Sequence, residues 1–350
     1  MEGGFVKLAG AILVGIIVVV IVASGFFLAG SGNSITGLFA SSAGAQQTGG
    51  QEKIVLADIP GLPHGVVYVA LKKGFFEKRG LDVKVEKFTF GSRAFEALFA
   101  GKVDVAMVGD FPAALAAFKS KDFVITGTLS ENYYVMVARQ DRGITSFADL
   151  RGKNIAVKTG TGPQFLFNKV LEREGLDSED VFARDVDPTL MPLALVRGDV
   201  DAIFAWPPFD LKASQTLGAN AIVLPLSDVH KVMILLVFRK EFVEKNPQAV
   251  RKFMSALVDA EEFIKQNPAE SRKAISEITG LTDEDLQRLW SRQKFEVFLK
   301  EGLTDDLREQ GAFAVSKGLA KSTGSLPDFC SLVYANALKE AAPEKVSLKC

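Results

Sequence analysis

The sequence contains few of the residues that build metal centres and disulfide frameworks. Its 350 residues include 2 cysteines, Cys330 and Cys350, and 2 histidines, His64 and His230. Two cysteines exclude a disulfide-rich scaffold, although outside the cytoplasm these two could close a single loop. The histidines lie far apart and show no metal-ligand spacing, so no metal site is expected.

The signatures of nucleotide and nucleic-acid binding are also missing. No glycine is followed at the required spacing by Gly-Lys-Ser or Gly-Lys-Thr, and Gly160-x-Gly162 lacks the third glycine of a dinucleotide fingerprint. The formal net charge of −1 gives no electrostatic reason to expect a nucleic-acid partner. We therefore expect neither a nucleotide cofactor nor a nucleic-acid ligand.

Charge is absent from an apolar run at residues 8–29. Because about 20 residues span the hydrocarbon of a bilayer, residues 1–30 are predicted to form a transmembrane helix that anchors the protein. Lys7, just before the run, favours an amino end inside the cell. The alternative is a cleaved signal peptide, with a cleavage site near residues 43–45. Residues 31–51 are rich in Ser, Gly, Ala and Gln and predict a flexible linker.

Residues 81–118 show a strand, loop and helix pattern that occurs twice. Val83 and Val85 alternate with charged residues, as in a strand, and residues 103–108 form a more continuously apolar strand. Helices between strands this close predict right-handed crossovers and a parallel sheet. The loops at residues 90–92 and 109–112 then follow the carboxyl ends of strands, which is the sheet edge where ligands bind.

The pattern restarts after Asp141, which predicts two α/β lobes. Lobe 1 would comprise residues 52–140 and 231–350, the latter a return strand at 232–238 followed by helices. Lobe 2 would comprise residues 141–230. The chain would cross between the lobes near residues 139–143 and again near residues 226–232. Two crossover segments of this kind form a hinge.

Four segments carry a resemblance to a known family: GFFEKRGLDVKVEKF, GSRAFEALFAGKVDVAMVGDFPAALAAF, DLRGKNIAV and NPQAVRKFMSALVDAEEFIKQNP. They resemble the solute-binding proteins of ABC importers for sulfonates, nitrate and taurine. That superfamily also includes proteins that bind the pyrimidine precursor of thiamine. The resemblance covers roughly residues 52–340, and it implies the two-lobe periplasmic-binding-protein type II fold with two hinge crossovers.

The resemblance implies an extracytoplasmic binding protein that is not an enzyme. It would capture a small oxyanion between the lobes and deliver it to an ABC permease, whose ATPase subunit drives import. One alternative is a binder of a thiamine pyrimidine precursor or another heteroaromatic. Another is a biosynthetic enzyme on the same fold, although the cysteine-rich metal motif of the related pyrimidine synthases is missing. A sensor would require a cytoplasmic output domain, and only a few residues precede the apolar run.

The loop from Thr159 to Pro163 is the most specific local feature for ligand binding. It joins a strand to a helix, and free N–H groups at a helix start attract anions, although an ordinary turn would have the same sequence. Ser92 and Asp110 either contact ligand or cap helices. The segment Trp206-Pro207-Pro208-Phe209 resembles the family's Trp-x-Pro pattern, and an aromatic side chain there would either close over ligand or pack between lobes. The predicted ligand-binding residues are Pro63, His64, Phe90, Gly91, Ser92, Gly109, Asp110, Glu131, Asn132, Thr159, Gly160, Thr161, Gly162, Asp187, Trp206 and Phe209.

Overall fold

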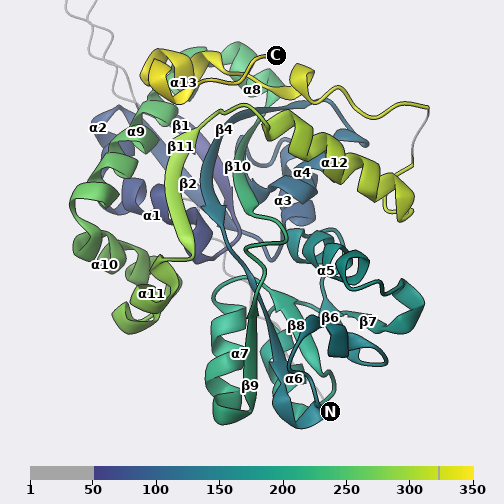
Figure 1. The fold of residues 1–350 in the computed structure, drawn as a ribbon. Helices are drawn as coiled ribbons and strands as arrows, with labels where there is room; N and C mark the ends of the chain where they lie inside the picture. Colours follow the sequence, from purple (N-terminus) through teal and green to yellow (C-terminus); the bar gives the residue numbers. More distant parts are fainter. Residues whose placement is uncertain (1–50, 322–323) are drawn as a thin grey trace, which may run out of the picture. The chain divides into compact units, whose positions relative to one another are not determined.

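The computed structural model describes residues 51–321 and 324–350 of the chain (Figure 1). The predicted membrane anchor and nearly all of the predicted linker lie in residues 1–50, outside this range, so both stay predictions. Within the described residues, no helix combines the length and the apolar character that crossing a membrane requires.

Six strands form the larger of two sheets, in the order β11-β4-β10-β3-β1-β2. β1, β2 and β3 run parallel to one another and are joined by helices, as the strand and helix pattern predicts. β10 lies antiparallel between β3 and β4, and β11 pairs antiparallel with β4 at the edge. The strands are β1 (Glu52–Asp58), β2 (Leu81–Lys87), β3 (Val105–Gly109), β4 (Phe123–Asn132), β10 (Val232–Arg239) and β11 (Gln293–Phe298).

Helices cover this larger sheet, and together they make up the larger lobe (Figure 1). α9 shows why they pack there: Val250, Phe253, Met254 and Leu257 recur at helical spacing, and all four are fully buried. The helices of this lobe are α1 (Gly65–Lys72), α2 (Phe75–Lys78), α3 (Gly91–Phe99), α4 (Asp110–Ala117), α8 (Lys240–Lys245), α9 (Pro247–Gln266), α10 (Pro268–Thr279), α11 (Asp283–Trp290), α12 (Leu303–Ser316) and α13 (Asn336–Ala341).

Five strands form the second sheet, in the order β7-β6-β8-β5-β9, and this sheet with its helices is the smaller lobe. β6 runs parallel to β7 and β8, whereas β5 runs antiparallel to β8 and β9. The elements are β5 (Val135–Arg139), β6 (Asn154–Val157), α5 (Gly162–Arg173), β7 (Phe182–Asp185), α6 (Met191–Arg197), β8 (Ala202–Ala205), α7 (Phe209–Leu217) and β9 (Ala221–Pro225).

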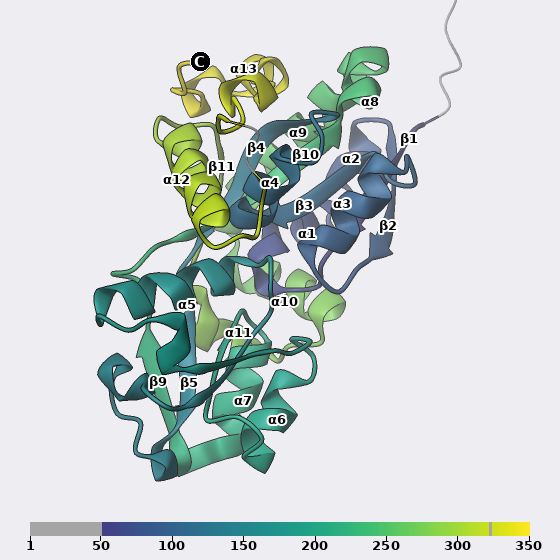
Figure 2. The ribbon, with the colours of Figure 1, turned by 90° about the vertical axis from the view of Figure 1, so that its right-hand side faces the viewer.

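The chain passes twice between the two lobes (Figure 2). The first passage is at Tyr133 and Tyr134, between β4 and β5, and the second runs from residue 226 to 231. The sequence placed the first passage later, near residues 139–143. That placement was wrong because Ser130–Asn132 looked like a break, whereas these polar residues continue the ladder of β4 and are buried.

β11 is a second difference from the sequence-based expectation, which made everything after residue 238 helical. Gln293, Phe295 and Val297 are buried and alternate with charged residues that are less buried. The period-2 signal was therefore present, but its partner β4 lies far away in the sequence. Beyond this strand, Cys330 and Cys350 form a disulfide with a Cα–Cα distance of 5.3 Å, which fixes the C-terminal tail.

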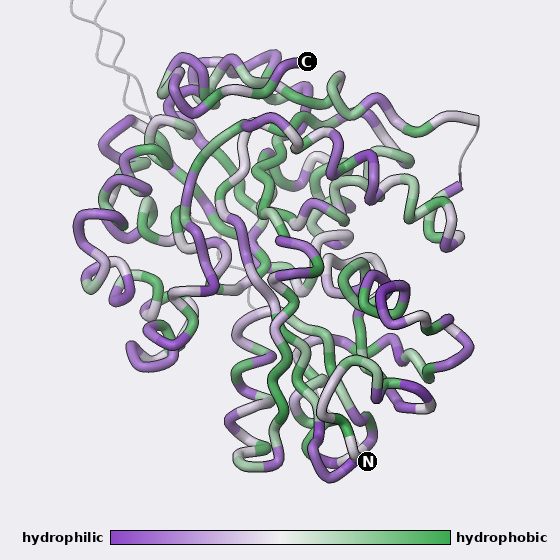
Figure 3. The backbone as a smooth tube through the Cα atoms, viewed as in Figure 1, coloured by the Kyte–Doolittle hydropathy of each residue, from purple (hydrophilic) through white to green (hydrophobic). Residues whose placement is uncertain are grey.

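The central strands of the larger sheet are part of the apolar core. Figure 3 shows hydrophobic residues along the strands in the middle of the larger sheet and hydrophilic residues on the outer helices. β10 is the clearest case, because every residue from Val232 to Phe238 is buried. A strand that is apolar on both faces must be covered on both sides, so β10 belongs at the centre of the sheet.

Candidate functional site

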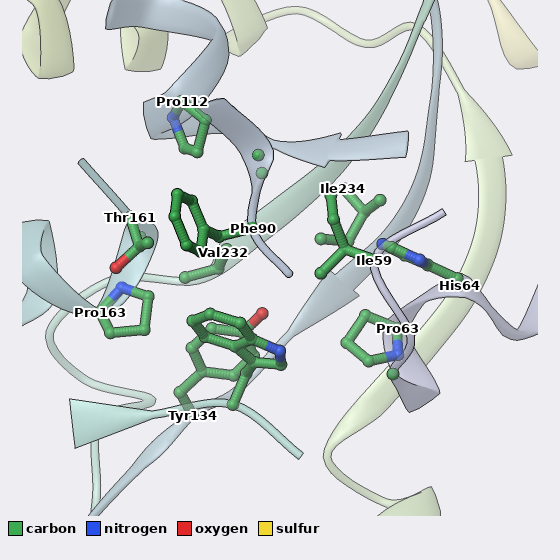
Figure 4. Close-up of a pocket in the computed structure, with 15 residues that line it drawn as sticks. Ile59, Pro63, His64, Phe90, Pro112, Tyr134, Thr161, Pro163, Val232 and Ile234 are labelled. Atoms are coloured by element: carbon green, nitrogen blue, oxygen red, sulfur yellow. The ribbon is translucent and has the colours of Figure 1, made fainter. Parts of the chain in front are cut away.

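A cavity lies between the two lobes, at the carboxyl ends of the parallel strands (Figure 4). Thr161 and Pro163 of the smaller lobe line one side, and Pro63 and His64 of the larger lobe line the opposite side. The volume open to the centre of a water molecule is about 50 Å³. This is room for only a few water molecules. The two lobes therefore lie close together around the cavity in this structure.

Two helices from opposite lobes begin at this cavity. Gly91 is the first residue of α3 in the larger lobe, and Gly162 is the first residue of α5 in the smaller lobe. Both glycines line the cavity, and neither helix has a side-chain cap on its first turn. The start of α3 presents the N–H groups of Gly91 and Ser92. The start of α5 presents that of Gly162, because Pro163 has no N–H and the Gln164 N–H donates to the Thr161 carbonyl. Each start also carries the positive end of a helix dipole, so negative charge is favoured between them.

The start of α4 is neutralised by its own side chain. Gly109 lines the cavity, but the next residue, Asp110, accepts a hydrogen bond from the Phe111 N–H at 2.8 Å. Its second carboxylate oxygen accepts from the Met233 N–H at 3.1 Å. Asp110 is therefore a buried structural cap that ties α4 to β10.

His64 is held in one orientation by a buried carboxylate. Its Nδ1 lies 2.8 Å from Oδ1 of Asp58, and the Tyr68 hydroxyl donates to the same oxygen at 2.9 Å. Burial, reinforced by the charge of Asp58, raises the pKa of Tyr68 well above its usual value, so this tyrosine stays a donor. With Nδ1 occupied, Nε2 has no protein partner within the described ranges and is the ring nitrogen left for a ligand.

Aromatic side chains form the other walls of the cavity. Phe90 lies above the cavity and Tyr134 below it, and Trp206 lines it as well (Figure 4). The hydroxyl of Tyr134 makes no hydrogen bond to any residue that the structure describes, and burial raises its pKa. Nζ of Lys158 stands over the Phe90 ring, 5.0 Å from the centroid, but Lys158 does not line the cavity. The walls thus offer apolar surface without a lining Lys or Arg.

The structure brings together eight of the predicted ligand-binding residues. They come from five loops that are distant in the sequence but meet at one place. The eight are Pro63, His64, Phe90, Gly91, Gly109, Thr161, Gly162 and Trp206. The Thr161 hydroxyl donates to the Lys158 carbonyl oxygen at 2.6 Å, so donors for an anion here must come from the backbone.

Four further predicted residues lie next to the cavity rather than in its wall. Ser92, Thr159 and Gly160 line a neighbouring cavity. Phe209 packs edge-on against Trp206, with ring centroids 5.7 Å apart, and so supports the wall from behind.

The structure places the remaining predicted residues, Asp110 among them, in structural contacts. Glu131 forms an ion pair with Lys231 at 2.7 Å, and the side-chain amide of Asn132 donates to the Val232 carbonyl at 3.0 Å. Asp187 accepts a hydrogen bond from the Thr189 N–H at 2.9 Å. Polar groups at strand ends were read as ligands because the sequence does not show the backbone and lysine partners that satisfy them.

Sequence reasoning missed several cavity residues. Tyr134 lies in the first passage between the lobes, and Val232 and Ile234 lie at the start of β10, directly after the second passage. Which way these side chains point depends on how the two sheets meet. Successive side chains of a strand point to opposite faces, so the sequence indicated that at most one of Tyr133 and Tyr134 could face the cleft. The cavity residues that were not among the predicted ligand-binding residues are Ile59, Gly61, Pro112, Tyr134, Pro163, Val232 and Ile234, although Pro112 and Pro163 belong to loops that were predicted to lie at the site. Over the described part of the chain, no group of three or more His, Cys, Asp or Glu is arranged to hold a metal.

Two α/β lobes, joined by two passages and enclosing a cavity, define the class of two-lobe solute-binding folds. The chain belongs to the NMT1/THI5-like family, whose model matches residues 62–271. The periplasmic aliphatic sulphonate binding protein SsuA of Escherichia coli superposes with a TM-score of 0.70 at 18% identity, covering 82% of this chain and 99% of SsuA. The predicted α/β two-lobe periplasmic-binding-protein fold is therefore confirmed.

Relatives with higher identity match part of the chain. A putative binding protein of Brucella abortus is 31% identical over 192 residues, which cover 53% of this chain and 58% of that protein. A putative aliphatic sulfonates-binding protein of Bacillus subtilis is 29% identical over 189 residues, covering 52% of this chain and 57% of that relative. The resemblance to sulfonate-binding proteins that the sequence predicted is thus confirmed, and the match spans little more than half of these relatives.

Proposed function

We propose that this protein is the extracytoplasmic solute-binding protein of an ABC importer, and that it binds a small organic oxyanion, with a sulfonate ahead of nitrate. The observation that carries the proposal is the convergence of α3 and α5, from opposite lobes, on one cavity. Two helix starts favour an anion, and aromatic walls favour an organic one. The name of the Bacillus subtilis relative, an aliphatic sulfonates-binding protein, agrees with this chemistry.

Binding in this arrangement would stabilise the closed form. The N–H groups at the start of α3 belong to the larger lobe and the Gly162 N–H to the smaller lobe, so an anion between them contacts both. Because an open form separates the two sets of donors, the ligand has a higher affinity for the closed form and shifts the equilibrium toward it. The closed form would then dock on a permease, and the partner ATPase would supply the energy. No covalent step is needed.

The proposed location is outside the cytoplasm. The Cys330–Cys350 disulfide supports it, because such bonds persist in oxidising compartments. Residues 1–30 would anchor the body through a membrane helix, with residues 31–51 as the tether. A cleaved leader would instead release it.

A neutral heteroaromatic, such as a thiamine pyrimidine precursor, is the second candidate ligand. The specific observation in its favour is His64: its Nδ1 contacts Asp58, which leaves Nε2 as the ring nitrogen that can hydrogen-bond to a ligand ring. The free Tyr134 hydroxyl and the aromatic walls also suit a planar ring that carries amino groups.

Trp206 provides the test. We expect alkanesulfonates to change its fluorescence when they bind. Calorimetry with the full-length protein would compare their affinity with that of taurine, nitrate and the thiamine pyrimidine. The sequence has 2 tryptophans. Trp206→Phe should abolish the fluorescence change, whereas Trp290→Phe, a control at α11, should retain it. Tight binding of the pyrimidine with none of any oxyanion would overturn the oxyanion assignment in favour of the second candidate.

A further inference from the structure

Phe165 on α5 joins the two lobes outside the ligand cavity. The residue belongs to the smaller lobe, yet its ring packs against two rings of the larger lobe. Its ring centroid lies 5.6 Å from that of Phe111 on α4 in a stacked arrangement, and 5.1 Å from that of Phe313 on α12 in an edge-on arrangement. The residues that line the cavity do not include Phe165, so a ligand there would not touch it.

This contact between the lobes is apolar and closed to solvent. Phe111 is fully buried, Phe165 is 1% exposed, and Ala314 of α12 completes a small apolar cluster with them. Leu115, from the next turn of α4, is partly buried and packs against the same cluster. Because apolar surface is driven out of water, separating the lobes at this point would be unfavourable.

An ion pair one helical turn further along α5 adds to the contact. Nζ of Lys169 lies 2.7 Å from Oε1 of Glu309 on α12, the helix that lies next to α5 in both views (Figures 1 and 2). The hydrogen bond to Glu309 raises the pKa of Lys169, so the lysine keeps its positive charge. The same ammonium lies 5.8 Å from the ring centroid of Phe165, which is four residues away on the same side of the helix.

The helix that carries Phe165 also forms part of the cavity wall. Gly162, the first residue of α5, lines the cavity, and Phe165 follows one helical turn later. Phe111 has a similar place in the larger lobe, because Gly109, just before α4, lines the cavity as well. Both rings are held on helices, so the contact between them fixes how far the Gly162 N–H lies from the larger lobe.

Phe167, two residues further along α5, shows what an ordinary core position on this helix looks like. Its ring packs edge-on against Phe204 of β8 within the smaller lobe, with centroids 5.3 Å apart. Phe167 is 3% exposed, so it is about as deeply buried as Phe165. Phe165, in contrast, has its aromatic neighbours in the larger lobe and at His230 of the second passage. The core of the smaller lobe therefore accounts for Phe167 but not for Phe165.

From these contacts, and resting on the proposed function for the ligand itself, we infer that Phe165 is a positioning residue for ligand binding. It holds α5 against α4 and α12 in the closed form, and so holds the Gly162 N–H where a ligand meets both lobes. Part of the ligand affinity therefore comes from an apolar contact that the ligand does not touch. Loss of this contact lowers the population of the closed form, and the apparent Kd rises by the same factor.

Quenching of Trp206 fluorescence by acrylamide measures closure of the full-length protein without any ligand. Trp206 lines the cavity and is 8% exposed, so separation of the lobes should open it to the quencher. All proteins in the test carry Trp290→Phe, which leaves Trp206 as the only tryptophan. We expect Phe165→Ala to raise the quenching constant about twofold or more as the open form gains population. The matched control Phe167→Ala, which removes an equally buried ring from the same helix, should leave it unchanged.

Reversal of the ion pair gives a second test that leaves the apolar core intact, and it protects the experiment against a Phe165→Ala variant that does not fold. Lys169→Glu places two carboxylates against each other across the lobe boundary, so it should also raise the quenching constant. Lys169→Glu combined with Glu309→Lys restores opposite charges and should return the constant toward the wild-type value. Lys72→Glu is the control, because Lys72 and Glu277 form a similarly exposed pair within the larger lobe.

Calorimetry with butanesulfonate then connects closure with affinity, and we expect Phe165→Ala and Lys169→Glu to raise its Kd about fivefold or more. Unchanged quenching in both variants would overturn the inference whatever the ligand is. Increased quenching with an unchanged Kd would overturn the positioning role. If the wild type fails to bind butanesulfonate while the quenching differences remain, the sulfonate assignment is overturned and the role of Phe165 in closure stands.

Discussion

Arg292, just before β11 in the larger lobe, forms an ion pair with Asp210 on α7 in the smaller lobe. Asp210 is 1% exposed, so the pair is buried on the carboxylate side. Nε of Arg292 also donates to the Tyr133 carbonyl at 3.1 Å, within the first passage between the lobes. One guanidinium therefore joins both lobes and a segment on which they hinge.

Removal of Arg292 should strongly destabilise the protein. Arg292→Gln leaves the Asp210 carboxylate buried without its partner, and breaking such a pair costs about 3–5 kcal/mol. Urea denaturation should record this loss in the free energy of unfolding. Arg93→Gln is the control, because Arg93 and Glu96 form an exposed pair, whose loss should cost at most about 1 kcal/mol. Equal effects of the two substitutions would contradict a buried, structurally important pair.

Stability should depend on pH through His230. Burial lowers the pKa of His230, but its interaction with Asp110 and the charges of Asp306 and Glu309 outweigh burial and raise it. The folded protein therefore binds this proton more tightly than the unfolded chain, whose histidine has a pKa of about 6.5. The stabilisation is complete below that value and is lost as pH rises through the folded-state pKa.

The measurement is the melting temperature of wild-type protein and His230→Gln between pH 5.5 and 8.5. We expect the wild type to lose more stability than the variant as pH rises from about 6.5. Parallel curves would show that the proton on His230 is not linked to folding.

Gly162 should be required for full closure. A Cβ at this position would lie 3.2 Å from Cγ1 of Val232, so alanine forces α5 and the start of β10 apart. We expect Gly162→Ala to weaken sulfonate binding by roughly 1 kcal/mol, or about fivefold in Kd. The double variant Gly162→Ala with Val232→Ala removes the crowding methyl groups and should recover part of the loss in calorimetry. Equal binding by wild type and the single variant would show that this contact does not limit closure.

The Cys330–Cys350 disulfide should stabilise the larger lobe. It closes a loop with a sequence separation of 20 residues. A loop of this order contributes about 3 kcal/mol through the entropy of the unfolded chain. Cys330→Ser with Cys350→Ser should lower the free energy of unfolding by about that amount and make it insensitive to a thiol reductant, which should destabilise only the wild type. A reductant effect that persists in the variant would exclude the disulfide as its cause.

The sequence predicted the loops of the site better than its walls. Local periodicity predicts where a strand is followed by a turn and a helix, and such turns contain Phe90, Gly91, Thr161 and Gly162. Because the carboxyl ends of parallel strands meet at one edge, the local pattern was enough to bring these loops together.

What the sequence did not reveal depends on contacts between distant segments. Tyr134 and Val232 lie at the passages, and their orientation is set by two sheets at once. Glu131 was read as a ligand because its lysine partners, Lys231 and Lys294, come from elsewhere in the chain. A strand that pairs with a segment more than a hundred residues away leaves no local record of that pairing, which is why β11 was missed.

The position of β10 has a consequence for the order in which the two lobes can fold during synthesis. β3 and β4 are neighbours in the chain, yet β10 separates them in the sheet. Until residues beyond the whole smaller lobe have been synthesised, β3 and β4 each have an open edge where β10 will pair. The larger lobe thus begins to fold first and is completed after the smaller one. A chain truncated before Val232 should leave β4, which lacks both β10 and β11, unprotected in amide exchange, whereas β3 keeps β1 as a partner.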